Sequence, residues 1–186
     1  MQRVIAALFV ATLFAVPLGG CTTNRTFGAG LNDSAADLTL KRYLLADTNY
    51  DYSDIDITVF EGRLMLTGSV RSDAARRALA AKAQLVPTVT EVLNEVIVGP
   101  RTGIGQGTSD ALIDERLGAA LLTDNGIFRS NYQIAVSKGV VYLLGVAQGA
   151  QELERVTSHA QTVPGVKRVV SHVIFVGDPR RQAPRR

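Results

Sequence analysis

The sequence is poor in the residues that carry most catalytic and metal-binding chemistry. It has one cysteine, two histidines and no tryptophan among 186 residues. A single cysteine cannot form a disulfide within the chain, so the fold must be held together by packing alone. The histidines, His159 and His172, have no cysteine or acidic residue nearby at metal-ligand spacing, which favours surface histidines over a zinc site.

Other functional signatures are also missing. The acidic cluster of Asp51, Asp54 and Asp56 is not followed by the glycine and the distal glutamate of an EF-hand. The glycines between 103 and 107 do not join a strand to a phosphate-binding helix, so they predict a linker. No serine lies in a Gly-x-Ser-x-Gly setting, and no base-stacking aromatics accompany the basic residues. We therefore expect no enzymatic activity, no metal, no cofactor and no nucleic-acid partner.

The N-terminus has the pattern of a secretory signal. Arg3 precedes an apolar run over 4–16, and Leu18-Gly19-Gly20-Cys21 follows. An uncleaved membrane helix is the alternative, but the run is shorter than the about 20 residues that a spanning helix needs. The four residues that end at Cys21 resemble the lipobox of bacterial lipoproteins.

The lipobox resemblance implies that residues 1–20 are removed and that Cys21 carries a diacylglycerol on sulfur and an acyl chain on its amine. Two or three acyl chains are enough for stable membrane anchoring. With Cys21 acylated, no thiol remains for catalysis or metal binding. In lipoproteins of enterobacterial type, a residue other than aspartate after the cysteine, here Thr22, favours the outer membrane.

The net charge of +3 is local rather than spread over the chain. Four of the 20 basic residues lie in the tail 178–186 and one is Arg3. That leaves 15, against 16 acidic residues once Asp178 is set aside. A Pro/Arg tail of this kind predicts disorder. It could contact anionic lipid or lipopolysaccharide, or it could simply be solvated.

The chain contains a repeat. Sliding the sequence on itself by 77 positions aligns apolar residues, glycines and prolines without a gap, while charged positions differ. This pattern indicates a duplicated scaffold whose two surfaces have diverged. The matched pairs include Leu40 with Leu117, Leu66 with Leu143, Gly68 with Gly145, Pro87 with Pro164, and Val92 with Val169.

Each copy predicts the order α-β-β-α-β. Helical spacing of apolar residues marks a first helix around Leu40 and, in the second copy, a helix from Asp110 to about Leu122. Alternating residues over 55–66 and 132–143 predict hairpins that turn at a glycine. A second helix and a final strand, 89–98 or 166–175, complete each copy. The expected fold class is α+β, with helices packed on a small three-stranded mixed sheet.

The domain boundaries follow from these elements. We expect a signal peptide over 1–20, a flexible tether over 21–34 and a first domain over 35–99. A Gly-rich linker over 100–108 would lead to a second domain over 109–176, and 177–186 would be a disordered basic tail.

Two segments carry a family resemblance. Residues 136–145 and 163–169 resemble the BON domain, and 59–68 with 86–92 give a weaker second match. With the lipobox, the whole mature chain is similar to the dual-BON, DolP-like outer-membrane lipoproteins. The resemblance implies a non-enzymatic protein on the periplasmic face of the outer membrane. Such proteins support membrane integrity, and their second BON domain binds anionic phospholipid through its first helix.

In this chain the lipid-binding position of that helix falls on Leu112, with Arg116 placed to meet a phosphate. Leu112 lies well off the buried stripe of the helix. Asp110, Asp114 and Glu115 speak against the role because they would repel an anionic surface, although acidic residues also suit a helix N-terminus. An ordinary exposed leucine is the alternative.

We thus expect a monomeric lipid-binding scaffold whose partners are the outer membrane and its anionic phospholipids. Two other hypotheses remain open. The first is an adaptor whose sheets bind an envelope protein, and the second is a periplasmic stress protein or chaperone.

Overall fold

The computed structural model describes residues 27–181. The predicted signal peptide and lipidated Cys21 lie outside this range. No helix within residues 27–181 is both long and apolar enough to cross a membrane.

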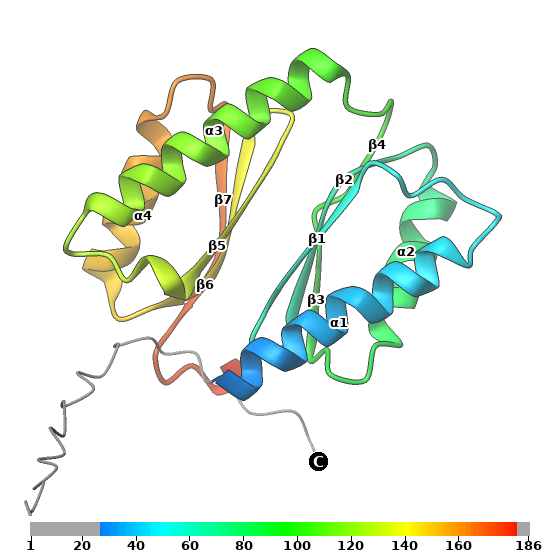
Figure 1. Ribbon diagram of the computed structural model, residues 1–186, viewed down its shortest axis with the longest axis horizontal. Coiled ribbons are helices and arrows are strands. Elements are labelled where there is room, and N and C mark those ends of the chain that lie inside the picture. Colours follow the sequence, from blue (N-terminus) through cyan, green and yellow to red (C-terminus); the bar gives the residue numbers. More distant parts are fainter. Residues whose placement is uncertain (1–26, 182–186) are drawn as a thin grey trace, which may run out of the picture.

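The two copies of the repeat form two domains with the predicted order of elements (Figure 1). The first comprises α1 (Phe27–Leu45), β1 (Ile55–Phe60), β2 (Arg63–Val70), α2 (Asp73–Gln84), β3 (Glu91–Asn94) and β4 (Ile97–Val98). The second comprises α3 (Ile104–Thr123), the 3-10 turn η1 (Arg129–Asn131), β5 (Tyr132–Ser137), β6 (Val140–Ala147), α4 (Ala150–Thr162) and β7 (Arg168–Phe175). A last 3-10 turn, η2, covers Pro179–Arg181.

Each domain has a mixed sheet with the hairpin strands antiparallel and the final strand parallel. In the second domain the order is β5-β6-β7, and in the first it is β1-β2-β3, with β4 also paired to β2. The predicted single strand over 89–98 is therefore split. The backbone N–H of Val96 turns to the Asn94 side chain at the break, yet the pairs Leu66–Asn94 and Ser69–Ile97 keep one register.

The hairpins turn through two residues with positive φ, Glu61-Gly62 in the first domain and Lys138-Gly139 in the second. Two such residues in a row are typical of a type I′ turn, whose twist matches that of the flanking strands. The predicted turn positions are confirmed.

The helices of each domain cover one face of its sheet. In the first domain Leu40 of α1 and Leu79 of α2 are fully buried against Leu64 and Leu66. In the second domain the buried helical residues Leu117, Leu121, Val156 and Ala160 pack against Val141 and Leu143.

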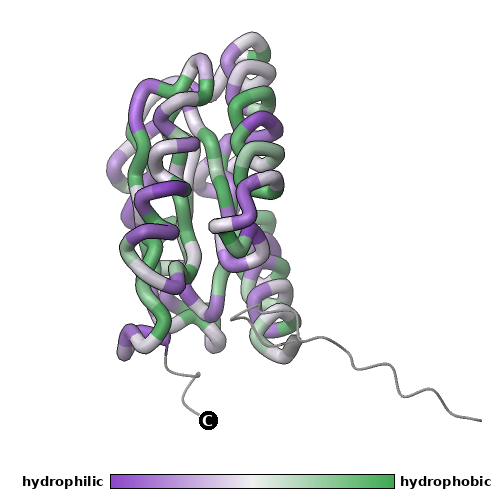
Figure 2. Tube along the Cα trace, turned by 90° about the vertical axis from the view of Figure 1, so that its left-hand side faces the viewer, coloured by the Kyte–Doolittle hydropathy of each residue, from purple (hydrophilic) through white to green (hydrophobic). Residues whose placement is uncertain are grey.

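The opposite faces of the two sheets pack on each other. A third apolar cluster joins Phe60, Met65, Ala135, Tyr142, Leu144, Val146 and Ile174, all buried. The molecule is therefore a four-layer sandwich with both sheets inside and the helices outside (Figure 1). Figure 2 shows α1 and α3 along one side of the molecule. Because both faces of each sheet are covered, a sheet face cannot serve as the binding surface of the adaptor hypothesis.

Three expected flexible segments are more ordered than predicted. Helix α1 begins at Phe27, so residues 27–34 of the expected tether are helical, and α3 begins at Ile104, inside the expected linker. In the first turns of α3 the side-chain amide of Gln106 donates to the Asp110 carboxylate, one turn later, at 2.9 Å. In the tail, Arg181 forms an ion pair with Glu61 at 2.8 Å.

Candidate membrane-contact site

Asp110 fixes α3 to the second domain. Its carboxylate is almost fully buried and accepts the backbone N–H groups of Lys138 and Gly139, each at 2.8 Å. Asp33 in α1 does the same with Glu61 and Gly62, at 2.8 and 2.9 Å. The expectation that Asp110 faces an anionic surface is therefore wrong. Its carboxylate is buried inside the domain, where it accepts two hydrogen bonds from the hairpin turn.

The outer face of α3 carries the two residues predicted to contact lipid. Leu112 is 45% exposed and Arg116 is also exposed. They stand one turn apart, a spacing that puts side chains side by side on a helix. Glu115 is exposed on the same outer surface and lowers its positive charge. The structure thus places Leu112 and Arg116 together in solvent, where a bilayer could reach them.

The sequence interpretation missed apolar residues at the C-terminal end of α3. Leu122 is exposed at 73%, and Phe128 is exposed in the loop that follows. Leu121 and Leu122 are adjacent, and only one of two adjacent helical residues can face the core. Their adjacency was the signal that one of them must point outward.

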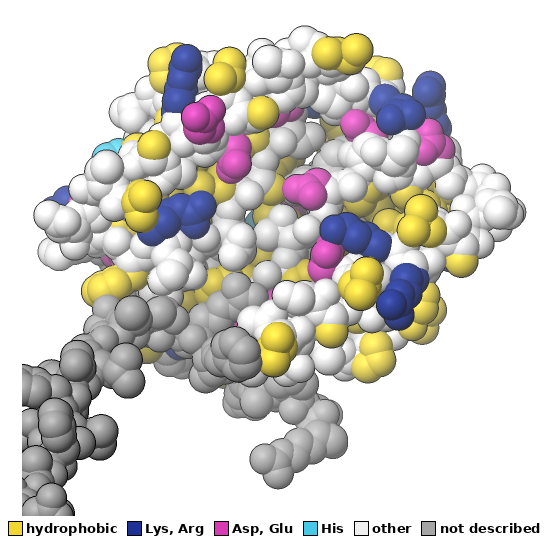
Figure 3. All heavy atoms as spheres, viewed as in Figure 1, with side chains coloured by type: hydrophobic (Ala, Val, Ile, Leu, Met, Phe, Trp, Pro, Cys, Tyr) yellow, Lys and Arg dark blue, Asp and Glu magenta, His cyan; other side chains and the backbone are white. Residues whose placement is uncertain are grey.

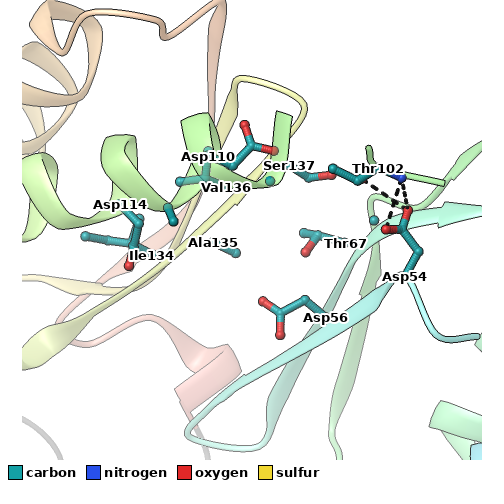
Figure 4. A pocket seen from close by; sticks show the side chains of 13 residues that line it. Asp54, Asp56, Thr67, Thr102, Asp110, Asp114, Ile134, Ala135, Val136 and Ser137 are labelled. Atoms are coloured by element: carbon teal, nitrogen blue, oxygen red, sulfur yellow. Dashed lines mark hydrogen bonds between the residues drawn. The ribbon is translucent and has the colours of Figure 1, made fainter. Parts of the chain in front are cut away.

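A cavity of about 320 Å³ lies between the domains, beside α3 (Figure 4). Asp54 on its wall is fully engaged, because it accepts bonds from the Ser69 hydroxyl and from the Thr102 backbone N–H at 3.1 Å. Asp56 on β1 and Asp114 on α3 also line the cavity, one from each domain. Such acidic walls would repel a phosphate, so this cavity is a poor site for an anionic headgroup.

Asp56 and Asp114 are exposed residues, yet neighbouring atoms partly desolvate both carboxyl groups. The pKa of Asp114 is raised mainly by desolvation, with Arg129 opposing and the charge of Asp56 reinforcing the shift. Desolvation also raises the pKa of Asp56. Within residues 27–181 no three His, Cys, Asp or Glu side chains are grouped as metal ligands.

The two histidines have acidic partners that their sequence positions did not reveal. His159 lies 2.9 Å from Asp124, and His172 lies 2.8 Å from Glu95 of the other domain. The His159 hydrogen bond is the main cause of the lowered pKa of Asp124. Both side chains are partly exposed, His159 at 34% and His172 at 21%, and each is paired with one carboxylate.

Two arginines of the basic tail form ion pairs within the protein. Arg180 bonds Asp178 at 2.8 Å, an interaction that lowers the pKa of that carboxyl to about 2. Arg181 donates from Nε and Nη2 to the two carboxylate oxygens of Glu61, at 2.8 and 2.9 Å. These two arginines are therefore less available to a membrane than their sequence pattern indicated.

A family model for the BON domain matches residues 32–100 and 109–177. Each range covers one domain of the structure except for the first turns of its first helix, because α1 begins at Phe27 and α3 at Ile104. The resemblance seen in the sequence is confirmed for both copies.

Individual relatives agree with the family match. A protein of Anaplasma centrale described as "Uncharacterized protein in gshII 5′ region" is 37% identical over 66% of this chain and 82% of its own length. "Outer membrane lipoprotein DolP" of Haemophilus influenzae is 23% identical over 89% of each chain. "Osmotically-inducible protein Y" of Escherichia coli is 28% identical over 76% of this chain and 72% of its own.

Proposed function

Because the chain belongs to the BON domain family and carries two copies of the domain, we propose that it is a non-enzymatic lipoprotein of the outer membrane. In this proposal Cys21 anchors it to the periplasmic face, and the second BON domain binds anionic phospholipid through Leu112 and Arg116. By these contacts it supports the integrity of the membrane. The similarity to an outer-membrane lipoprotein over 89% of both chains supports this assignment.

The observation that carries the lipid-binding role is the placement of α3. The sheets are buried between the domains, so α3 forms part of the outside of the molecule (Figure 1). Leu112 can insert between headgroups while Arg116, one turn away, meets a phosphate oxygen. Asp110 does not oppose this contact because it is buried on the hairpin turn.

The anchor and the helix would act together. Acyl chains on Cys21 keep the protein at the membrane, and the tether then presents α3 to headgroups at high effective concentration. A weak headgroup contact is sufficient under these conditions. The headgroup contact directs the protein to membrane regions of suitable lipid composition, while the acyl anchor keeps it on the membrane.

Co-sedimentation of residues 22–186 with vesicles tests the proposal. Phosphatidylcholine vesicles with and without phosphatidylglycerol, at low and high salt, separate charge-dependent binding from apolar binding. Leu112→Glu and Arg116→Glu should each weaken binding to the anionic vesicles. Leu85→Glu is the matched control, since Leu85 is a comparably exposed leucine at the end of α2.

A chain that ends after Gly177 distinguishes the domain from the tail. Binding that persists without the tail and falls with Leu112→Glu supports the second BON domain as the lipid site. Binding that disappears with the tail, or that never occurs, would contradict the proposal and leave Cys21 as the membrane device. Crosslinking in cells that recovers a protein partner instead of lipid would then favour the adaptor function.

A further inference from the structure

Helix α1 is apolar on two opposite sides. Its inner side, with Ala36 and Leu40, is buried under the first sheet. On its outer side Leu31, Leu38 and Leu45 are exposed at 58%, 51% and 86%. Their seven-residue spacing brings them back to the same side every two turns. A monomeric domain gains nothing from three aligned leucines in water, so this side needs a partner.

The charged residue within this row of leucines is basic. We define the outer stripe of α1 as Leu31, Ala35, Leu38, Arg42 and Leu45, all of them exposed and none acidic. Lys41 is adjacent, and its amine also bonds Asp37 at 2.8 Å. A row of leucines with an arginine among them suits the surface of a phospholipid bilayer. The leucines can contact the acyl region while the arginine meets the anionic phosphates.

The second domain provides an internal comparison. The repeat places Thr108, Leu112, Glu115, Ala119 and Leu122 of α3 at the positions of the outer stripe. There the central leucine is replaced by a glutamate and the arginine by an alanine. The two helices share one scaffold, and only Leu45 has a leucine counterpart, Leu122. Leu31 and Leu38 are therefore not required by the BON fold and need another explanation.

An open pocket continues the outer stripe at its C-terminal end. It has a volume of about 450 Å³ and shares Leu45 with the stripe. Its other walls include Leu44, Tyr50, Tyr52 and Ile57, with Lys41 at the same site. In the second domain the residue equivalent to Tyr50 is Ile127, which is buried in the core. The pocket therefore adds a recessed apolar surface to the exposed leucines of the outer stripe.

The closeness of α1 to Cys21 in the chain favours a membrane as the partner of the outer stripe. Only five residues, 22–26, lie between Cys21 and Phe27 at the start of α1, so the two are six residue steps apart. Fully extended, six residues span about 20 Å at most. If Cys21 is lipidated as proposed, the first turn of α1 is confined near the bilayer. Figures 2 and 3 place α1 and α3 toward the same side of the molecule, so one surface could engage both helices.

We propose that the outer stripe of α1 is a second bilayer contact, in which the three leucines enter the headgroup layer and Arg42 meets phospholipid phosphate. This inference rests on the proposed membrane function, but it assigns part of the binding to the first BON domain. The chain would then lie on the membrane through two helices and one anchor.

The test uses residues 22–186 and the vesicles described above. Leu38→Glu places a charge at the centre of the outer stripe, and burial of one leucine corresponds to about tenfold or more in affinity. We therefore expect vesicle binding to weaken by at least about tenfold, with Leu85→Glu unchanged. Leu38 is exposed, so the thermal unfolding midpoint should stay as in the parent chain. Leu38→Ala, which adds no charge, should weaken binding by a smaller factor.

The outcomes separate the two proposals. If Leu112→Glu weakens binding and both Leu38 variants do not, the α1 contact is overturned while the second domain keeps its lipid site. If the Leu38 variants weaken binding and Leu112→Glu does not, α1 is the contact and the second-domain site is wrong. If the parent chain does not bind vesicles, or if photocrosslinkers at position 38 capture protein in place of lipid, the α1 contact is overturned.

Discussion

Asp110 in the second domain is the counterpart of Asp33 in the first, and each carboxylate holds the two backbone N–H groups at the tip of its own hairpin. Charge-assisted hydrogen bonds of this kind contribute about 1.5–3 kcal/mol each. We expect Asp110→Ala to lower the free energy of unfolding by about 3 kcal/mol in urea denaturation. Asp114→Ala, one turn further along α3, is the control and should cost little. Equal stability of Asp110→Ala and the parent chain would contradict the role of this bond pair.

Gly145 lies where the edge strand passes too closely for a side chain. A Cβ at this position would stand 2.1 Å from the backbone oxygen of Asn131, and φ is +158°. We expect Gly145→Ala to cost more than about 3 kcal/mol, because either the hairpin pairing or the backbone must shift. Gly99→Ala is the control, since a Cβ there meets nothing within 4 Å. Thermal unfolding of the two variants checks this prediction. Equal melting temperatures of Gly145→Ala and Gly99→Ala would contradict the close approach.

Arg63 crosses the interface between the domains. It is buried in the first sheet, its Nε lies 2.5 Å from Glu91, and its Nη1 donates to the backbone oxygen of His172 at 2.7 Å. Removing one partner of a buried ion pair costs about 3–5 kcal/mol. Arg63→Ala should reach this range in chemical denaturation. Arg76→Ala, which breaks the exposed pair with Asp73, should cost less than about 1 kcal/mol.

Asp114 should make stability depend on pH. Burial raises its pKa above the ordinary value, so its charged form destabilises the folded state. The penalty is fully present above the raised pKa and disappears as pH falls through it toward the unfolded value of 3.8. Asp114→Asn should therefore be more stable than the parent chain at neutral pH, and the difference should vanish in acid. Melting curves from pH 7 to pH 3 would check this; a gain that grew on acidification would have the wrong sign.

Much of the fold follows from the repeat. Leu40, Leu66 and Gly68 and their counterparts 77 positions later occupy equivalent sites, and the pairings of Ile55 with Gly68 and of Tyr132 with Gly145 have the same register. These positions could be predicted because core packing and tight turns accept few residue types. The glycines near 105 predicted a linker because helix propensity disfavours them, yet they lie in the first turns of α3.

The packing of the two domains was hidden for a different reason. The alternation of Leu64 and Leu66 predicts that one face of the hairpin strands is buried and that the other face is exposed to water. Met65 and Leu144 on the opposite side are also buried and apolar. A strand that is apolar on both sides indicates a sheet with two covered faces. That signal was present in the sequence, but it does not say which surface supplies the second cover.

Leu112 and Arg116 could be proposed from the sequence because they lie off the buried stripe of their helix, and both are exposed in the structure; their contact with lipid stays a prediction. The outer stripe of α1 was not found, since its first turns were assigned to a flexible tether. The partners of His159 and His172 come from distant parts of the chain, and sequence spacing carries no information about them.

The sheet-to-sheet contact also governs how the chain can come apart. Either domain alone would turn Phe60 and Met65, or Tyr142 and Leu144, toward water. The two halves should therefore melt in a single cooperative transition, and a protease cut between Gly99 and Gly103 should leave two fragments that remain associated. By the same logic, a chain with a single BON domain of this kind would have to cover its bare sheet from elsewhere, most simply by pairing with another copy of itself.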